Sequence, residues 1–207
     1  MEKHILMRNV VCFVLVLALI ICSAFVLGTV SFAASTINGG DTITENGTYT
    51  LANNATGTIT IQTGLTVTLV GQGVETSAAC SNITIECGGA VNLTINNVYL
   101  REAIDASHNI INFTGGSNKL ILSGSNLIEA TDYVGGAVIH VGPQTDLTIG
   151  GDGTMYLYKY TAGSGIGANA NEANGPITFE SGNIFIKGSK TGALIGNDTC
   201  GNAEKEA

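Results

Sequence analysis

The stretch NITIECGGAVNLTINNVYL at residues 82–100 contains the pattern that decides the fold. It holds three short runs, NITI, VNLTI and NNVYL, in which apolar and polar residues alternate, with Gly-Gly and Asn-Asn at the breaks. Alternation with a period of two predicts strands with one buried face, and the breaks are too short to contain helices. The stretch therefore predicts three consecutive strands joined by tight turns.

The same three runs recur through everything after residue 55. First runs begin near 58, 82, 110, 137, 164 and 193; second runs follow the first five of them, and third runs are clear from the second unit onward. Each series steps by about 27–30 residues, apart from one first-run step nearer 24. Repeats of this length bury their apolar faces only by stacking on one another. We therefore expect an all-β protein, a right-handed parallel β-helix with three strands and about 27–28 residues per coil.

Composition divides the chain into three parts. Residues 1–33 combine two basic residues, a long apolar stretch and a small-residue site, which is typical of a secretory signal peptide cleaved after Ala33. The apolar stretch is also long enough for an uncleaved anchor, and this alternative stays open. We expect residues 34–55 to form irregular amino-terminal cap strands. Residues 56–207 are expected to form the β-helix, which stops just after a new first run and is predicted to be truncated at its carboxyl end.

The charge balance limits the partners. The chain has 16 acidic and 8 basic residues, for a net charge of −8. A nucleic-acid partner is not expected, because phosphate binding needs clustered Lys and Arg. No membrane contact is expected beyond the signal segment.

Cys80 and Cys87 are predicted to flank one strand on opposite faces, too far apart for a disulfide. The composition, together with the predicted signal segment, is typical of a secreted or cell-surface β protein.

No residues stand in an arrangement suited to catalysis. A polysaccharide lyase needs calcium-binding carboxylates and a basic residue, and a glycoside hydrolase needs two carboxylates at a fixed separation. The aspartates fall singly in turns or at strand starts. His108 and His140 are isolated, and His140 alternates with Ile139 and Val141, so both histidines are expected to be plain surface residues. We therefore expect no enzyme, no catalytic residues and no cofactor, with calcium left open.

The third runs place aromatic residues on one outer face. In each run the apolar neighbours of an aromatic residue are expected to point inward, so the aromatic residue itself points outward. Stacking of like runs would bring these residues into a row that either stacks on sugar rings or packs against protein. In the second unit Leu127 or Ile128 fills the row, and the register stays open because one choice would bury Glu129. The candidate carbohydrate-binding residues are Tyr99, Tyr156, Tyr158 and Phe185.

Asparagine recurs just before the third runs. Asn97, Asn126 and Asn183 share this place, with Gly153 in the fourth unit. Asn and Gly tolerate the left-handed backbone of a corner, and stacked Asn side chains can hydrogen-bond along the coil axis. We expect an asparagine stack at this corner, with a structural role.

Two stretches resemble known families. GTYTLANNATGTITIQTGLTVTLVGQG at 47–73 resembles the opening of bacterial secreted proteins with a carbohydrate-binding β-helix domain. GSGIGANANEANGPITFESGNIFIKGSKTGALIGN at 163–197 resembles the Gly-rich unit of Firmicutes cell-surface β-solenoid repeat proteins. The resemblance implies a right-handed β-helix at the cell surface that binds polysaccharides, acidic or cellulosic, sometimes with calcium. It transfers no ligand residue position by position, and the chain lacks a recognisable wall anchor.

These observations favour a secreted or cell-surface, non-catalytic β-solenoid that binds a polysaccharide or cell-wall glycan. The main alternative is a structural or adhesin-like surface repeat protein without sugar specificity. A polysaccharide lyase or glycoside hydrolase is the less favoured third hypothesis. The sequence leaves open which glycan would be bound.

Overall fold

The computed structural model describes residues 34–74, 80–81, 83–102, 109–130, 136–159, 163–188 and 192–197. Every regular element in these ranges is a β-strand, and all strand pairings are parallel. A search of the same ranges finds no helix with the length and apolar character needed to cross a membrane. The predicted signal peptide lies outside the described residues and stays a prediction.

The strands form three parallel sheets, here called A, B and C. Sheet A comprises β1 (Ser35–Ile37), β3 (Gly47–Leu51), β5 (Thr66–Val70), β8 (Asn92–Asn96), β11 (Gly116–Ser123), β14 (Thr145–Gly151) and β17 (Ile177–Phe179). Sheet B comprises β2 (Thr42–Ile43), β4 (Gly57–Ile61), β7 (Ile83–Cys87), β10 (Ile111–Phe113), β13 (Ile139–Val141), β16 (Ile166–Gly167) and β19 (Ile195–Gly196). Sheet C comprises β6 (Cys80–Ser81), β9 (Tyr99–Glu102), β12 (Ser125–Ala130), β15 (Thr154–Lys159) and β18 (Asn183–Gly188).

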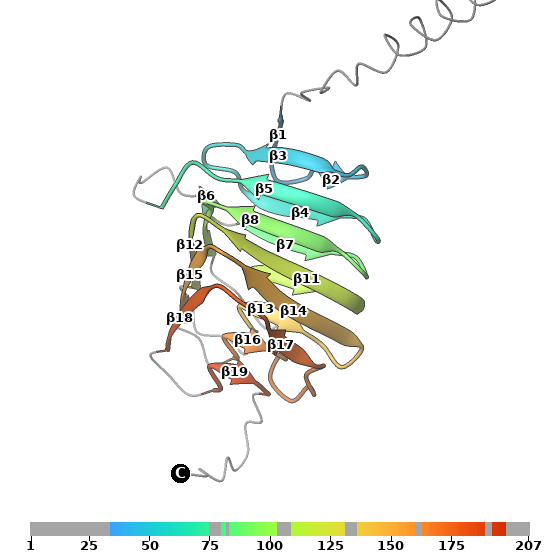
Figure 1. Cartoon of the computed structure of the whole chain (residues 1–207), viewed down its shortest axis with the longest axis vertical. Coiled ribbons are helices and arrows are strands. Elements are labelled where there is room, and N and C mark those ends of the chain that lie inside the picture. The colour runs from blue at the N-terminus through green and yellow to red at the C-terminus, as the bar shows by residue number, and fades with distance from the viewer. Residues whose placement is uncertain are drawn as a thin grey trace, which may run out of the picture. The chain divides into compact units, whose positions relative to one another are not determined.

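From β7 onward the chain visits sheets B, A and C in a fixed order, once per coil, so that like strands stack along one axis (Figure 1). In sheet B, for example, Ile85 pairs with Ile111 and Ile111 pairs with Ile139, so equivalent residues of three successive coils lie side by side. The predicted parallel β-helix is thereby confirmed, with three strands in each of these coils.

The first coils differ in detail from the prediction. Alignment of the first runs by sequence places Ile59 beside Ile83, whereas the structure pairs Ile59 with Ile85. This shift leaves the same side chains inward, because Ile83 and Ile85 are alternate residues of one strand and face the same side. The segment 34–55, predicted to form irregular cap strands, adds β1 and β3 to sheet A and β2 to sheet B. Within the described part of the chain, sheet C begins only at β6.

The core lies between the three sheets and is built from inward rows of aliphatic side chains. An inner row of sheet B is completely buried from Ile59 through Ile85, Ile111 and Ile139 to Ile166, and it continues to Ile195 in the last described coil. Full burial of such a side chain contributes roughly 2–3 kcal/mol. In the last described coil the apolar side chains are more exposed, as Phe179, Leu194 and Ile195 show. They border a shallow apolar depression together with Ile184 and Ile186.

The asparagines at the corner before sheet C do not form the predicted stack. Asn126 pairs with Met155 and Asn183 with Thr154, so the two asparagines belong to different rows. Asn126 instead points inward and is completely buried. Its Oδ1 accepts a hydrogen bond from the Val98 amide at 3.1 Å. One asparagine therefore links two coils through their backbone, and no column of asparagines is needed.

Candidate functional site

The third strands present an outward row on sheet C. Register places Tyr99 beside Leu127, Leu127 beside Tyr156 and Tyr156 beside Phe185. The neighbours Leu100, Ile128 and Leu157 are completely buried, since alternate residues of a strand face opposite sides. The open register of the second unit is thereby settled, with Ile128 inside and Leu127 in the outward row.

Tyr156 and Phe185 form the most exposed part of this row. Their ring centroids are 5.2 Å apart and their planes differ by 14°, so the rings stack on one another along the coil axis. Tyr156 is 37% exposed and Phe185 54%. The row is not the flat, continuous surface that the sequence suggested, because the two rings cover part of each other and Leu127 separates them from Tyr99.

A second outward row runs beside the first and carries polar groups. It consists of Arg101, Glu129, Tyr158 and Lys187. Glu129 connects the two rows, because its Oε2 accepts a hydrogen bond from the Tyr99 hydroxyl at 2.8 Å and lies 3.5 Å from Arg101 Nε. Partial burial raises the pKa of Tyr99, and the hydrogen bond to Glu129 and the charge of that carboxylate raise it further. Tyr158 lies in this second row, next to the aromatic pair.

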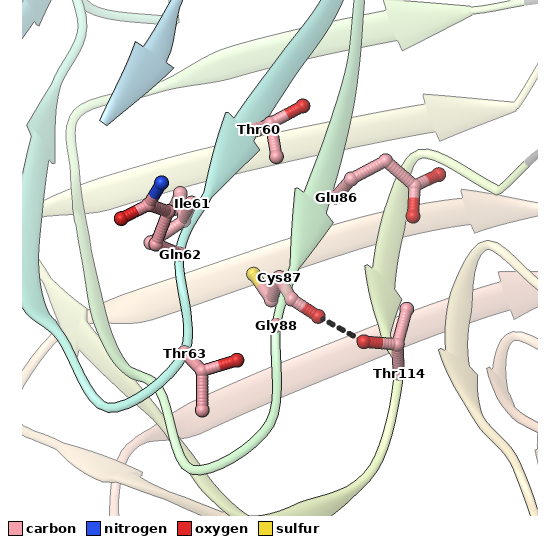
Figure 2. A pocket seen from close by; sticks show the side chains of 8 residues that line it. All are labelled: Thr60, Ile61, Gln62, Thr63, Glu86, Cys87, Gly88 and Thr114. Carbon is pink, nitrogen blue, oxygen red and sulfur yellow. Dashed lines mark hydrogen bonds between the residues drawn. The ribbon is translucent and has the colours of Figure 1, made fainter. Parts of the chain in front are cut away.

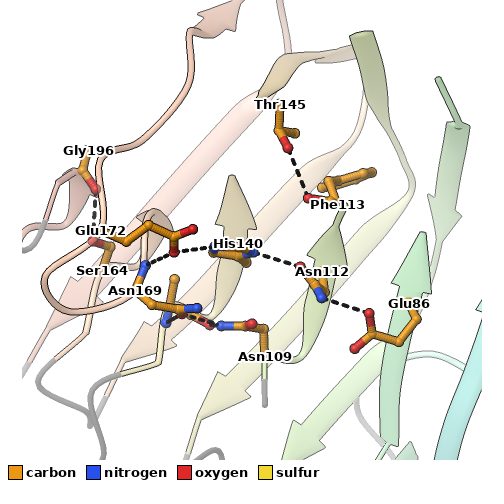
Figure 3. A network of polar contacts seen from close by, with 11 residues as sticks. Glu86, Asn109, Asn112, Phe113, His140, Thr145, Ser164, Asn169, Glu172 and Gly196 are labelled. Carbon is orange, nitrogen blue, oxygen red and sulfur yellow. Dashed lines mark hydrogen bonds and ion pairs between the residues drawn. The ribbon is translucent and has the colours of Figure 1, made fainter. Parts of the chain in front are cut away.

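Sheet B carries a polar row on its own outer face (Figure 3). Glu86, Asn112 and His140 are in register on β7, β10 and β13. Asn112 Nδ2 donates to Glu86 Oε2 at 2.7 Å, and Asn112 Oδ1 lies 2.7 Å from His140 Nδ1. His140 Nε2 lies 2.8 Å from Glu172 Oε2, on the segment after β16. The four side chains form one connected line across three coils and the following segment.

His140 is therefore not the plain surface residue that the sequence predicted. Its side chain is only 13% exposed. Glu86 can only accept hydrogen bonds when ionised, so it turns the amide nitrogen of Asn112 toward itself and the amide oxygen toward His140. The carboxylate of Glu172 is also an acceptor, so the contacts of His140 are fully satisfied when both ring nitrogens carry a proton. The other histidine of that prediction, His108, lies outside the described residues.

The segment that carries Glu172 is held at a second point. Asn169 Oδ1 accepts hydrogen bonds from Asn109 Nδ2 at 2.7 Å and from the Ala137 amide at 2.9 Å. Asn109 is itself buried and also donates to the Ala137 carbonyl at 2.7 Å. The side chains of Asn169 and Glu172 thus fasten residues 168–175 to sheet B, together with a hydrogen bond from the Gly175 amide to the Val141 carbonyl.

A shallow groove of about 450 Å³ lies on the outer side of sheet B near Glu86 (Figure 2). Five of its eight lining residues carry hydroxyl, amide or carboxylate groups, while most of the surface that they present to the groove is apolar. Thr114 Oγ1 donates to the Cys87 carbonyl at 2.8 Å at one side of the groove. The lining consists of Thr60, Ile61, Gln62, Thr63, Glu86, Cys87, Gly88 and Thr114.

Cysteines and metals contribute no site among the described residues. Cys80 lies in sheet C and Cys87 in sheet B, so the prediction that they flank one strand is wrong. Cys87 is buried, and burial, with the neighbouring Glu86 charge, raises the pKa of its thiol far above the usual range. Within the described ranges no group of three His, Cys, Asp or Glu side chains is placed to hold a metal ion.

Comparison of the chain with protein-family models, with curated proteins and with solved structures gives no match. The candidate sites therefore rest on the geometry of the chain itself.

Sequence reasoning located the sheet C row but missed the line on sheet B. The outward positions of Glu86, Asn112 and His140 follow from alternation, yet their mutual contact depends on the register between successive coils. Glu172 could not be included, because it follows a short strand and lies in no run. The sequence does carry one signal for Glu86, Asn112 and His140: each of them directly follows a buried isoleucine of sheet B, namely Ile85, Ile111 or Ile139.

Proposed function

We propose that the protein is a non-catalytic polysaccharide-binding β-solenoid, secreted or at the cell surface, with sheet C as the sugar-contacting side. The observation that carries this proposal is the exposed pair of Tyr156 and Phe185, stacked across two coils of a parallel sheet. Aromatic rings offer apolar surface to the C–H faces of sugar rings, and this pair presents two such rings side by side.

The polar row beside the aromatic pair supports the same function. Arg101, Glu129, Tyr158 and Lys187 supply donors and acceptors within reach of any chain of sugars that lies along the first row. The parallel stacking repeats both rows from coil to coil. A repeated surface suits a repeated ligand, because one extended polymer can contact several coils at once.

Retention on insoluble polysaccharides tests the proposal. The full chain is mixed with cellulose, xylan or pectin, with and without calcium, and the bound fraction is measured. We expect retention on at least one of them. The double substitution Tyr156→Ala and Phe185→Ala should weaken that retention roughly tenfold, as expected for losing about 1–2 kcal/mol of aromatic contact.

The matched control is Thr68→Ala with Thr94→Ala, two neighbouring outward residues of sheet A. This variant should be retained like the parent. Absence of retention on every polysaccharide, in both calcium conditions, would contradict sugar binding and favour a structural surface role. Equal retention of the aromatic variant and the parent would remove sheet C as the contact surface.

A further inference from the structure

The outer side of sheet B has two equivalent places, two coils apart. The last residues of its strands are in register, so the residues that follow them also form a row. Gly88 and Gly142 both lie in this row. Each follows an outward polar residue by two positions, Glu86 in one case and His140 in the other.

The place at Gly142 is filled by the protein itself. Glu172 Oε1 lies 3.1 Å from the position that a Cβ on Gly142 would take, and Glu172 Oε2 lies 2.8 Å from His140 Nε2. The backbone amide of Asn169 also donates to Oε2 at 3.3 Å. An anionic group therefore occupies this place and is paired with the donor nitrogen of the imidazole (Figure 3).

The place at Gly88 has a different neighbour. A Cβ on Gly88 would lie 2.7 Å from both Thr63 N and Thr63 Oγ1, so Thr63 packs directly against this glycine and both residues border the groove. Glu86 stands where His140 stands in the filled place. The one hydrogen bond that the structure gives its carboxylate, among the described residues, comes from Asn112. An ionised carboxylate has room for about four donors, so most of its accepting capacity is unused.

The hydroxyl groups of the groove also favour a donor ligand. Thr114 donates its hydroxyl hydrogen to the Cys87 carbonyl, so its Oγ1 offers only lone pairs to the groove (Figure 2). Thr60 and Thr63 carry exposed hydroxyls that can accept as well as donate. A ligand with ammonium and hydroxyl donors would satisfy these groups, whereas a uronic acid would place its carboxylate against Glu86.

We propose that the Gly88 groove binds a glycan with free amino groups, with an ammonium group of the sugar on Glu86 and its hydroxyls on Thr60, Thr63 and Thr114. This inference rests on the proposed polysaccharide-binding function and adds a second sugar contact on sheet B, separate from the aromatic pair of sheet C. The contact repeats, with donor and acceptor exchanged, the hydrogen bond between His140 and Glu172 in the filled place. The net charge of −8 favours the same cationic class of glycan.

Calorimetric titration with two matched hexasaccharides tests the inference. One is a β-linked glucosamine hexamer with free, protonated amino groups, and the other is its fully N-acetylated form. The full chain should bind the free amine at least about tenfold more tightly, as expected for a charge-assisted hydrogen bond. Glu86→Gln should remove that preference while its amide oxygen still accepts from Asn112.

Asp146→Asn removes the same charge from an exposed position of sheet A and should change the affinity by less than about twofold. Thr60→Lys, which brings an ammonium group into the groove, should block the amine sugar, and thermal unfolding of each variant checks its folding. Equal binding of both hexamers, or a Glu86→Gln variant that binds like the parent, overturns the groove assignment but leaves retention through Tyr156 and Phe185 untouched. If binding depends on Glu86 but the aromatic pair gives no retention, the groove on sheet B remains supported and sheet C is ruled out as a sugar-contacting surface.

Discussion

At the scale of single residues, the buried asparagines are the least expected components of the core. Asn126 bonds backbone groups on three sides: it accepts from the Val98 amide and donates to the Ser123 and Thr154 carbonyls at 3.0 and 3.2 Å. Asn118 at the start of β11 does the same for the Val91 amide at 2.9 Å. Such contacts satisfy peptide groups that the sheet ladders leave unpaired at the corners, which matters because an unpaired buried group is costly.

Replacing Asn126 by alanine should therefore be strongly destabilising. The change leaves three backbone groups without their partner and opens a small cavity, for an expected loss of about 2–4 kcal/mol in the free energy of unfolding. Urea unfolding followed by circular dichroism measures it. Asn92→Ala removes a half-buried, outward-facing asparagine whose bond to Thr66 is 3.4 Å long, and should cost under about 0.5 kcal/mol. Equal losses for the two variants would show that the buried amide does not hold the corner.

Tyr99 provides a test in the outward rows. Its pKa is raised by partial burial first and by Glu129 second, with Arg101 acting against both. Glu129→Gln should therefore bring the pKa of Tyr99 down toward its usual value, as read from the tyrosinate absorbance of the parent minus that of Tyr99→Phe. Because the folded pKa lies above the unfolded one, the stabilising contribution is complete below the unfolded pKa and is lost as the pH rises through the folded pKa. An unchanged titration in Glu129→Gln would contradict the contact.

At the scale of elements, the corners between sheets depend on close backbone approach. Gly151, at the end of β14, has a φ of 109°, and a Cβ there would lie 2.2 Å from the Leu122 carbonyl oxygen of the preceding coil. Gly64, in the turn before β5, has a φ of 79° with nothing within 4 Å of its Cβ position. The two glycines share a left-handed backbone and differ in available space.

Alanine substitutions at Gly64 and Gly151 separate the cost of backbone strain from the cost of steric crowding. Gly64→Ala should cost about 1–2 kcal/mol, as expected for a left-handed non-glycine residue. Gly151→Ala should cost about 2 kcal/mol more, because the coils must also move apart at that corner. Chemical unfolding of both variants gives the difference. A Gly151→Ala variant as stable as Gly64→Ala would mean that adjacent coils are not in contact at this corner.

The segment 168–175 depends on His140, which holds it through Glu172. Truncation of the imidazole removes this contact and leaves Asn169 as the other side chain that fastens the segment. His140→Ala should therefore quicken amide hydrogen exchange at residues 168–175, with exchange in β14 as the reference.

Asn169→Ala removes the other side-chain contact of this segment and should also quicken its exchange. Exchange at residues 168–175 that is the same in His140→Ala and in the parent would contradict the contact between His140 and Glu172.

At the scale of the whole molecule, the repeat predicted the architecture because the apolar alternation is redundant. Every coil repeats the requirement for inward Ile, Val or Leu, so one misplaced pairing, such as Ile59 with Ile83 in place of Ile85, leaves the buried face unchanged. The outward rows have no such redundancy. The contact of His140 with Asn112 depends on the register between successive coils, and so does the position of Leu127 between Tyr99 and Tyr156. This register could not be predicted from the sequence, because the turn lengths differ from coil to coil.

Both candidate sites depend on contact between neighbouring coils, and proton–proton contacts test this stacking most directly. Nuclear Overhauser effects should connect the ring of Tyr156 with that of Phe185, and the methyl groups of Ile85 with those of Ile111, as parallel stacking requires. Ring contacts of Tyr156 confined to residues near it in sequence, with none to Phe185, would contradict the stacked coils and both surfaces built on them.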